Sequence, residues 1–166
     1  MFNIGDAVFY GVHGVCIVEE ITGREIFGKV SDYYTLRPVY SLRSKVFVPV
    51  ERSDKSVELR RVMSHEDAEN VIHMLKNAES AWDDDSSARK ASFALTVRKC
   101  IPSELAVLVK TVYLKKKELE ARKKKLHTSD ERALDDAERI LFEELSFLFG
   151  IKREEVPFFI SQKLGL

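Results

Sequence analysis

Apolar and polar side chains alternate in short runs through residues 1–62, and glycine- or serine-containing turns separate the runs. Alternation with a period of two is typical of strands that bury one face. In the opening runs the alternating apolar positions are Val8, Tyr10, Val15, Ile17 and Ile21. Further runs follow at residues 32–38, 45–50 and 56–62. Several short strands in so few residues predict a small antiparallel β-barrel.

The period changes at Ser64. Ser64 and Asp67 have the spacing of a capping box, and acidic residues occupy the first helical turn, where they complement the helix dipole. Apolar residues then recur at helical spacing, at Val71, Ile72 and Leu75. This stretch predicts a helix.

Three more helices are predicted from their start and stop signals. One of Asp83, Asp84 and Asp85 can cap a helix that carries Arg89 and Phe93. The next helix begins at Pro102 or Ser103. The helix after it begins at Thr128 or Ser129 and ends at Gly150. Their predicted inner faces are Leu105, Leu108, Val109, Val112 and Tyr113, and Leu134, Ala137, Leu141, Leu145 and Leu148. A short last helix is expected at residues 152–165, with Val156, Phe159 and Ile160 packed inward.

These elements predict an α+β chain with a β-barrel domain at residues 1–62 and a compact helical bundle at residues 82–166. Residues 63–81 are expected to form a connecting helix and linker. The only tryptophan, Trp82, stands at this boundary, at or just before a helix N-terminus.

Charge is distributed unevenly along the 166 residues. The formal net charge is zero, yet residues 86–125 hold twelve basic and three acidic side chains. Such a block is typical of a surface that binds a polyanion, and equally of a solvated helix face. Charge alone does not choose between these interpretations.

Catalytic and metal-binding motifs are missing from the sequence. The four histidines lie apart from Cys16 and Cys100, and these two cysteines form no C-x-x-C pair, so we expect reduced thiols and no metal. No Walker loop, dinucleotide fingerprint or nucleophile elbow is present. Neither a signal peptide nor a membrane span is indicated. We therefore expect a cytoplasmic protein that is not an enzyme, binds no cofactor and does not contact a membrane.

The chain resembles the CarD family of bacterial RNA-polymerase-binding transcription regulators along nearly its whole length. In the first half the matching residues are Phe2-x-x-Gly-Asp-x-Val-x-Tyr10, His13-Gly14-Val15, Ile21-x-x-Arg-Glu-Ile-x-Gly28, Tyr33-Tyr34-x-Leu36 and Val48-Pro49-Val50. In the second half they are Trp82, Arg89, the helix centred on Leu105, and the run from Lys124 to Glu138.

The resemblance implies a Tudor- or SH3-like barrel that docks on the lobe of the polymerase β subunit, partly by pairing strands across the interface. The residues that match the family's contact positions are Arg24 and Ile26. Phe47 is a departure, because the family often has a basic residue there. Arg43 or Lys45 could supply the missing charge, or the contact could be apolar.

The resemblance also implies that Trp82 enters the minor groove at the upstream edge of the transcription bubble and stabilises the open promoter complex. The cations expected to hold DNA, largely independently of sequence, are Arg89, Lys90, Lys124, Lys125 and Arg132. The chain is expected to act as a monomer on the polymerase. From the residues alone, Trp82 could equally be an interdomain packing residue. Two other functions remain open, a ribosome- or RNA-binding protein with a KOW- or SH3-like barrel, and a purely protein-binding adaptor.

Overall fold

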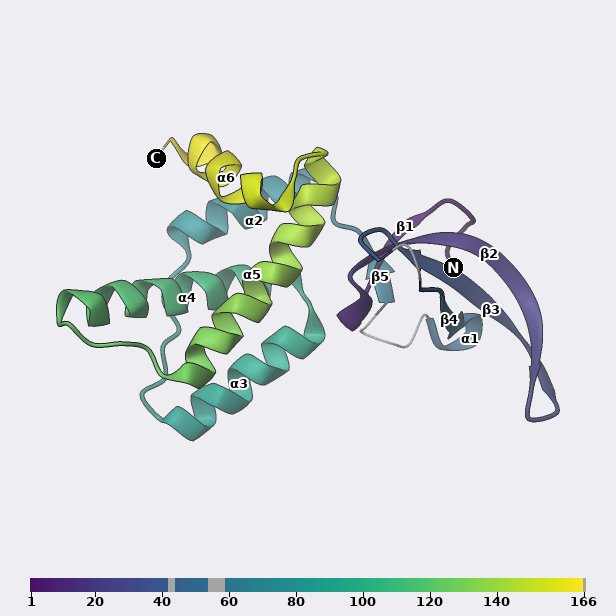
Figure 1. Cartoon of the computed structure of the whole chain (residues 1–166), viewed down its shortest axis with the longest axis horizontal. Coiled ribbons are helices and arrows are strands. Elements are labelled where there is room, and N and C mark those ends of the chain that lie inside the picture. Colours follow the sequence, from purple (N-terminus) through teal and green to yellow (C-terminus); the bar gives the residue numbers. More distant parts are fainter. Residues whose placement is uncertain (42–43, 54–58, 166) are drawn as a thin grey trace. The chain divides into compact units, whose positions relative to one another are not determined.

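The computed structural model describes residues 1–41, 44–53 and 59–165 of the chain (Figure 1). The chain divides into unit 1, Met1–Val62, and unit 2, Met63–Leu166. Together they confirm the predicted α+β class, because a β-sheet dominates unit 1 and the regular elements of unit 2 are helices.

Unit 1 contains a five-stranded antiparallel sheet with the strand order β4-β3-β2-β1-β5. A 3-10 turn, Gly11–His13, joins β1 to β2, and a short helix, α1 (Val50–Ser53), follows β4. The strands are β1 (Ala7–Tyr10), β2 (Val15–Ile26), β3 (Lys29–Pro38), β4 (Val46–Pro49) and β5 (Leu59–Arg61). Within the described residues, β4 and β5 are the two edge strands of the sheet and are not paired with each other. Closure of the sheet into a barrel therefore stays a prediction. Residues 56–58 of the last predicted strand lie outside the described residues.

One face of the sheet carries the core of unit 1. Its buried residues are Phe2, Val8, Cys16, Val18, Tyr34, Leu36, Val48 and Leu59. The backbone N–H of Phe2 donates to Oη of Tyr34 at 2.9 Å, and the two rings pack edge to face with centroids 5.7 Å apart. The beginning of the chain is thereby fixed to the centre of the sheet.

Strands β2 and β3 form a long hairpin. Its register runs from Cys16 opposite Pro38 to Ile26 opposite Lys29, with a bulge at Glu19. The loop consists of Phe27 and Gly28, both at positive φ (52° and 75°), as two-residue hairpin loops require.

Unit 2 contains five helices: α2 (His65–Asn77), α3 (Ser86–Lys99), α4 (Pro102–Ala121), α5 (Thr128–Phe149) and α6 (Val156–Leu164), the last preceded by a 3-10 turn at Arg153–Glu155. The predicted boundaries are confirmed at several ends. Ser64 and Asp67 form the capping box of α2, and Asp85 caps α3. Gly150 ends α5 in the left-handed conformation.

The main core of unit 2 is formed by α2, α4, α5 and α6. Its buried residues are Met63, Ala68, Val71, Ile72, Ala106, Leu141, Leu145, Val156 and Ile160. Helix α2 therefore contributes buried residues to this core.

Two residues that the patterns place on a buried face are exposed: Tyr113 of α4 is 45% exposed and Ile21 of β2 is 38% exposed. No residue of α4 from Tyr113 to Ala121 is buried, since this end of α4 extends past the helices on which it packs (Figure 1). Among the described residues, no helix combines the length and apolar character needed to cross a bilayer.

Candidate functional site

The structure brings Arg24, Ile26 and Phe47 together on one face of the sheet, which we call the Arg24 face. Arg24 lies opposite Ser31 and Phe47 lies opposite Thr35 in the register, so the pleat directs their side chains to the same side. The guanidinium carbon of Arg24 lies 3.8 Å from the centre of the Phe47 ring. Ile26 and Phe47 are 42% and 43% exposed, so this face offers apolar area beside the Arg24 cation.

Phe47 supports Arg24 by a cation–π contact. At exposed sites such contacts stabilise by about 0.5–1 kcal/mol. Of the two cations expected to replace a basic residue at this position, Lys45 is bound elsewhere, since its Nζ lies 3.1 Å from Oε2 of Glu19. Arg43 lies outside the described residues. The aromatic ring at position 47 therefore lies against the existing cation of Arg24.

Glu19 occupies the bulge of β2 and binds two cations. Lys45 and Arg37 both hydrogen bond to it, with Nε of Arg37 at 2.6 Å from Oε1. These bonds, that of Lys45 first, lower the pKa of the Glu19 carboxyl below its ordinary value. The bulge is thus fixed by charge on the solvent side of the sheet.

Beyond this bulge, one edge of β2 is open. Strand β1 pairs only with Val15–Ile17, whereas β3 pairs with β2 as far as Ile26. Within the described part of the sheet, residues 20–26 therefore have strand neighbours on one side only. Arg24 and Ile26 lie on this open segment. An extended segment of a partner can add to such an edge through backbone hydrogen bonds.

In unit 2, Trp82 lies in the loop before α3, within a cluster of aromatic and basic side chains. Its ring packs edge to face on Phe93, with centroids 6.4 Å apart. The guanidinium carbon of Arg89 lies 4.1 Å from the centre of the indole ring, and Nζ of Lys115 lies 5.3 Å from it. Trp82 is only partly buried, so part of its ring stays open to solvent.

Arg89 is buried and uses its guanidinium inside unit 2. Nε and Nη2 donate to the two carboxylate oxygens of Asp130 at 3.1 and 3.0 Å, and Nη1 donates to the carbonyl oxygen of Asp83 at 2.7 Å. The hydrogen bond to Asp130 is the main cause of the raised pKa of Arg89. These contacts direct Arg89 toward Asp130 and the Trp82 loop, which makes it a support for Trp82.

Further hydrogen bonds fix the Trp82 loop. The N–H of Ala81 donates to Oγ1 of Thr111 at 3.0 Å. Oδ1 of Asp85 accepts from the N–H of Ala88 at 2.8 Å, and Oδ1 of Asp83 accepts from the N–H of Asp85 at 2.9 Å. Two of the three consecutive aspartates therefore serve the turn and the helix cap.

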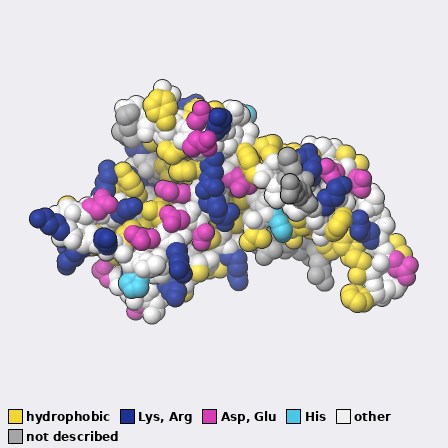
Figure 2. All heavy atoms as spheres, viewed as in Figure 1, with side chains coloured by type: hydrophobic (Ala, Val, Ile, Leu, Met, Phe, Trp, Pro, Cys, Tyr) yellow, Lys and Arg dark blue, Asp and Glu magenta, His cyan; other side chains and the backbone are white. Residues whose placement is uncertain are grey.

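The other predicted cations are on the surface. Lys90 lies on α3, Arg132 lies on α5, and Lys124 and Lys125 lie in the segment between α4 and α5, and all four are exposed. Figure 2 shows basic side chains gathered near the free end of α4. None of the four is among the residues that contact the Trp82 ring.

From the sequence, no role was predicted for four residues at the Trp82 site. Phe93 and Lys115 contact the indole ring, Thr111 bonds to the backbone of Ala81, and Asp130 bonds to Arg89. The sequence holds a signal for two of these residues, because Thr111 and Lys115 have the i, i+4 spacing that puts them on one face of a helix. In the structure the Trp82 loop contacts both residues. The pairing of Arg89 with Asp130 joins separate helices and has no local signal.

Two comparisons with known proteins found similarities to this chain. Residues 2–63 match the family described as "CarD-like/TRCF RID domain". The chain is also similar to a Bacillus subtilis (strain 168) protein named "Putative transcription factor YdeB", with 28% identity over 162 residues that cover 96% of this chain and 99% of the relative.

The family match covers unit 1 almost completely, and the similarity to the relative continues through unit 2. An RID domain is a polymerase-interacting domain, which supports RNA polymerase binding in general. The chain is thus a transcription-related protein. Together the two similarities support a CarD family assignment, with residues 2–63 as the part that matches the CarD-like/TRCF RID domain.

Proposed function

We propose that the chain regulates transcription by binding the lobe of the RNA polymerase β subunit through unit 1 and promoter DNA at the upstream fork through unit 2. It thereby stabilises the open promoter complex. It acts by binding alone, as a cytoplasmic monomer on the polymerase, without a chemical step or a cofactor.

The observation that carries the proposal is the open edge of β2 in an RID domain. Residues 20–26 offer backbone groups to an added strand, and Arg24 and Ile26 stand on the same segment. Strand addition supplies affinity through the backbone, while the side chains supply specificity. Phe47 orients the Arg24 guanidinium toward one place on the partner.

Trp82 is the proposed wedge at the fork. A partly exposed indole on a rigid support can enter an unstacked base step and disfavour reannealing of the strands. Arg89 and Asp130 supply the support, since they bind each other and Arg89 also binds the backbone of the Trp82 loop. Lys90, Lys124, Lys125 and Arg132 are the proposed phosphate contacts, which carry no sequence information.

The two contacts reinforce each other. Binding to the polymerase raises the local concentration of unit 2 at the fork, so weak affinity for free DNA is sufficient.

The test measures two quantities for the same variants: affinity for polymerase and the lifetime of open promoter complexes. Trp82→Ala is expected to shorten the lifetime at saturating protein and to leave polymerase affinity unchanged. Arg24→Glu is expected to weaken polymerase binding, while excess protein restores the lifetime. Trp82→Phe is the matched control, since it keeps an aromatic ring.

Two results would contradict the proposal. Open complexes that decay at their unaided rate even at saturating wild-type protein would exclude stabilisation. Equal losses of polymerase affinity in Trp82→Ala and Arg24→Glu would exclude the division of roles between the units.

A further inference from the structure

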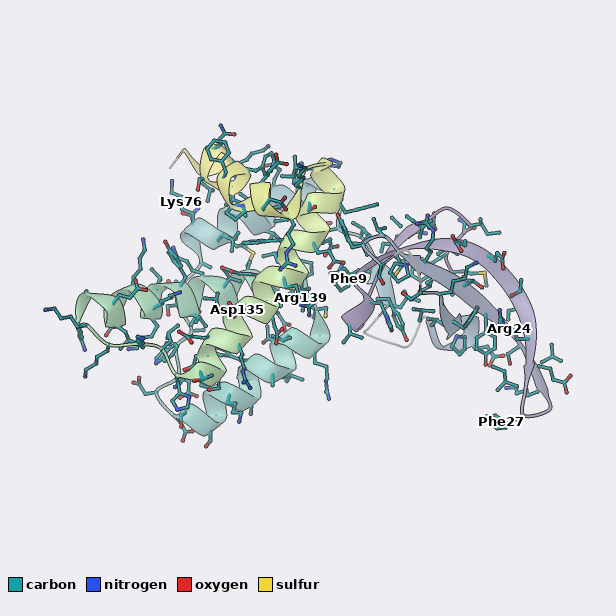
Figure 3. The ribbon with its side chains drawn as sticks, viewed as in Figure 1. Phe9, Arg24, Phe27, Lys76, Asp135 and Arg139 are labelled. Carbon is teal, nitrogen blue, oxygen red and sulfur yellow. The ribbon has the colours of Figure 1, made fainter. Side chains whose placement is uncertain are left out.

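Phe27 occupies an unusual position at the end of the β2–β3 hairpin. It has φ of 52°, and its side chain is fully exposed. Figure 3 shows Phe27 at the tip of the hairpin, with Arg24 farther back on the same hairpin. The next residue, Gly28, also has positive φ (75°).

An aromatic residue is poorly suited to this backbone conformation. Positive φ brings Cβ close to the backbone, and asparagine or glycine usually occupies such a loop position. Because the ring is in solvent, the fold gains no burial from it. The backbone strain at Phe27 is therefore not offset by burial of its ring within the fold. Such an uncompensated strained residue on the surface points to a role in binding.

The position of Phe27 relative to the open β2 edge indicates the partner. That edge runs along residues 20–26, and Phe27 is the next residue. Ile26, the last residue of the edge, is exposed, and so is Val30 just after the turn. A strand added to this edge would therefore bring the surface of the same partner to the hairpin tip.

We propose that Phe27 is an anchor residue, which enters an apolar pocket on the RNA polymerase β subunit beside the strand that pairs with β2. This inference rests on the proposed function and names a further specificity-determining residue of the same interface. A phenyl ring suits that role because it supplies a large contact area with few rotatable bonds to order. Its place on a two-residue turn restricts the ring further.

The test compares Phe27→Asn with Phe27→Trp in the full chain, using purified RNA polymerase core enzyme from the source organism. Asparagine fits positive φ, so Phe27→Asn is expected to melt at the same or a higher temperature than the wild type. Its affinity for the core enzyme is expected to fall about tenfold, as for the loss of one aromatic anchor. Phe27→Trp keeps the aromatic contact and is expected to retain most of the affinity.

Two controls accompany these variants. Val12→Asn removes another highly exposed apolar side chain of unit 1, 86% exposed, and should leave the affinity unchanged. Val12 precedes β2, so the length of that strand places it roughly 30 Å from the tip. Arg24→Glu tests the proposed function in the same assay.

The outcomes separate the two claims. If Arg24→Glu lowers the affinity and Phe27→Asn does not, the anchor is excluded and the proposed function stands. If neither variant lowers it, both are excluded. A loss of affinity in Phe27→Asn accompanied by a lower melting temperature, or shared equally by Phe27→Trp, would assign Phe27 to the shape of the turn and overturn the inference.

Discussion

Arg89 and Asp130 lie 41 residues apart in the chain, yet their side chains form two hydrogen bonds in the interior of unit 2. The same guanidinium contacts the Trp82 ring and the carbonyl oxygen of Asp83. One ion pair therefore joins α3, α5 and the loop that carries the tryptophan.

Breaking this pair is expected to destabilise the protein strongly. Asp130→Ala leaves the buried Arg89 without its partner, and the loss of one member of a buried ion pair typically costs about 3–5 kcal/mol of unfolding free energy. Urea titration measures this loss, and Trp82 fluorescence reports the change in the loop. Arg89→Lys, which keeps the charge without the two-pronged geometry, should also mobilise the loop. If both variants had the stability and the Trp82 fluorescence of the wild type, a role of the ion pair in supporting Trp82 would be excluded.

Removal of the Phe47 ring is expected to weaken polymerase binding without unfolding unit 1. Phe47→Ala releases Arg24, and the lost orientation corresponds to about 0.5–1 kcal/mol, or roughly a two- to fivefold change in affinity. Phe47→Tyr keeps the ring and should bind like the wild type. A binding assay on the core enzyme measures both variants. A larger loss in Phe47→Ala than in Arg24→Glu would mean that Phe47 contacts the partner by itself.

Glu144 is expected to fix the point where the chain enters unit 2. Its carboxylate is fully buried, and its Oε1 accepts from the N–H of Met63 at 2.8 Å. Glu144→Leu removes this acceptor and leaves a buried N–H unpaired, which costs about 1–3 kcal/mol. Glu144→Gln retains an amide oxygen and should lose less. Hydrogen exchange of the Met63 amide, which should accelerate only in Glu144→Leu, distinguishes a local effect from a general one.

Glu138 is expected to make stability depend on pH. Burial is the largest cause of the raised pKa of Glu138, and the negative charge of Asp135 is the second. The folded state therefore binds the proton of Glu138 more tightly than the unfolded state does. The stability gained from this proton is fully present below the unfolded pKa of about 4.3, and it is lost as pH rises through the higher folded pKa. Glu138→Gln should melt at a higher temperature than the wild type at pH 8, and the difference should vanish at pH 4.

The exposed Glu131 on the same helix provides the control for this measurement. Glu131→Gln removes one exposed carboxylate from α5, and its melting temperature is measured at the same two pH values. An equal pH dependence in both variants would exclude a specific effect at Glu138.

The lysines before α5 are expected to act through salt-dependent phosphate contacts. Replacing Lys124 and Lys125 together with alanine should lower the slope of log affinity against log salt by about 1.8, since each phosphate contact contributes about 0.9 on duplex DNA. Binding to polymerase at a promoter, measured over a salt series, gives the slope. Lys76→Ala, at a lysine that bonds to the carbonyl oxygen of Leu164 at the end of α6, should leave it unchanged.

Local patterns predicted the elements of this fold well, because their causes are local. The capping box at Ser64, the cap at Asp85 and the glycine at 150 each depend on residues within one turn. The exposure of Tyr113 could not be predicted in this way, since it depends on how far α4 extends past its neighbours.

For the candidate sites, too, residue positions could be predicted, whereas contacts that depend on the tertiary structure could not. The resemblance supplied Arg24, Ile26, Phe47 and Trp82 as positions. It could not supply the cation–π contact, which requires the register of three strands, or the burial of Arg89, which requires α3 to meet α5.

The open edge of β2 has a further consequence when no polymerase is bound. A strand with unsatisfied backbone groups can pair with another copy of the same chain and begin aggregation. Residues 20–26 carry Glu20, Arg24 and Glu25 and are interrupted by Gly23, a composition that disfavours self-pairing. These charges therefore disfavour edge-to-edge pairing between two copies of the chain.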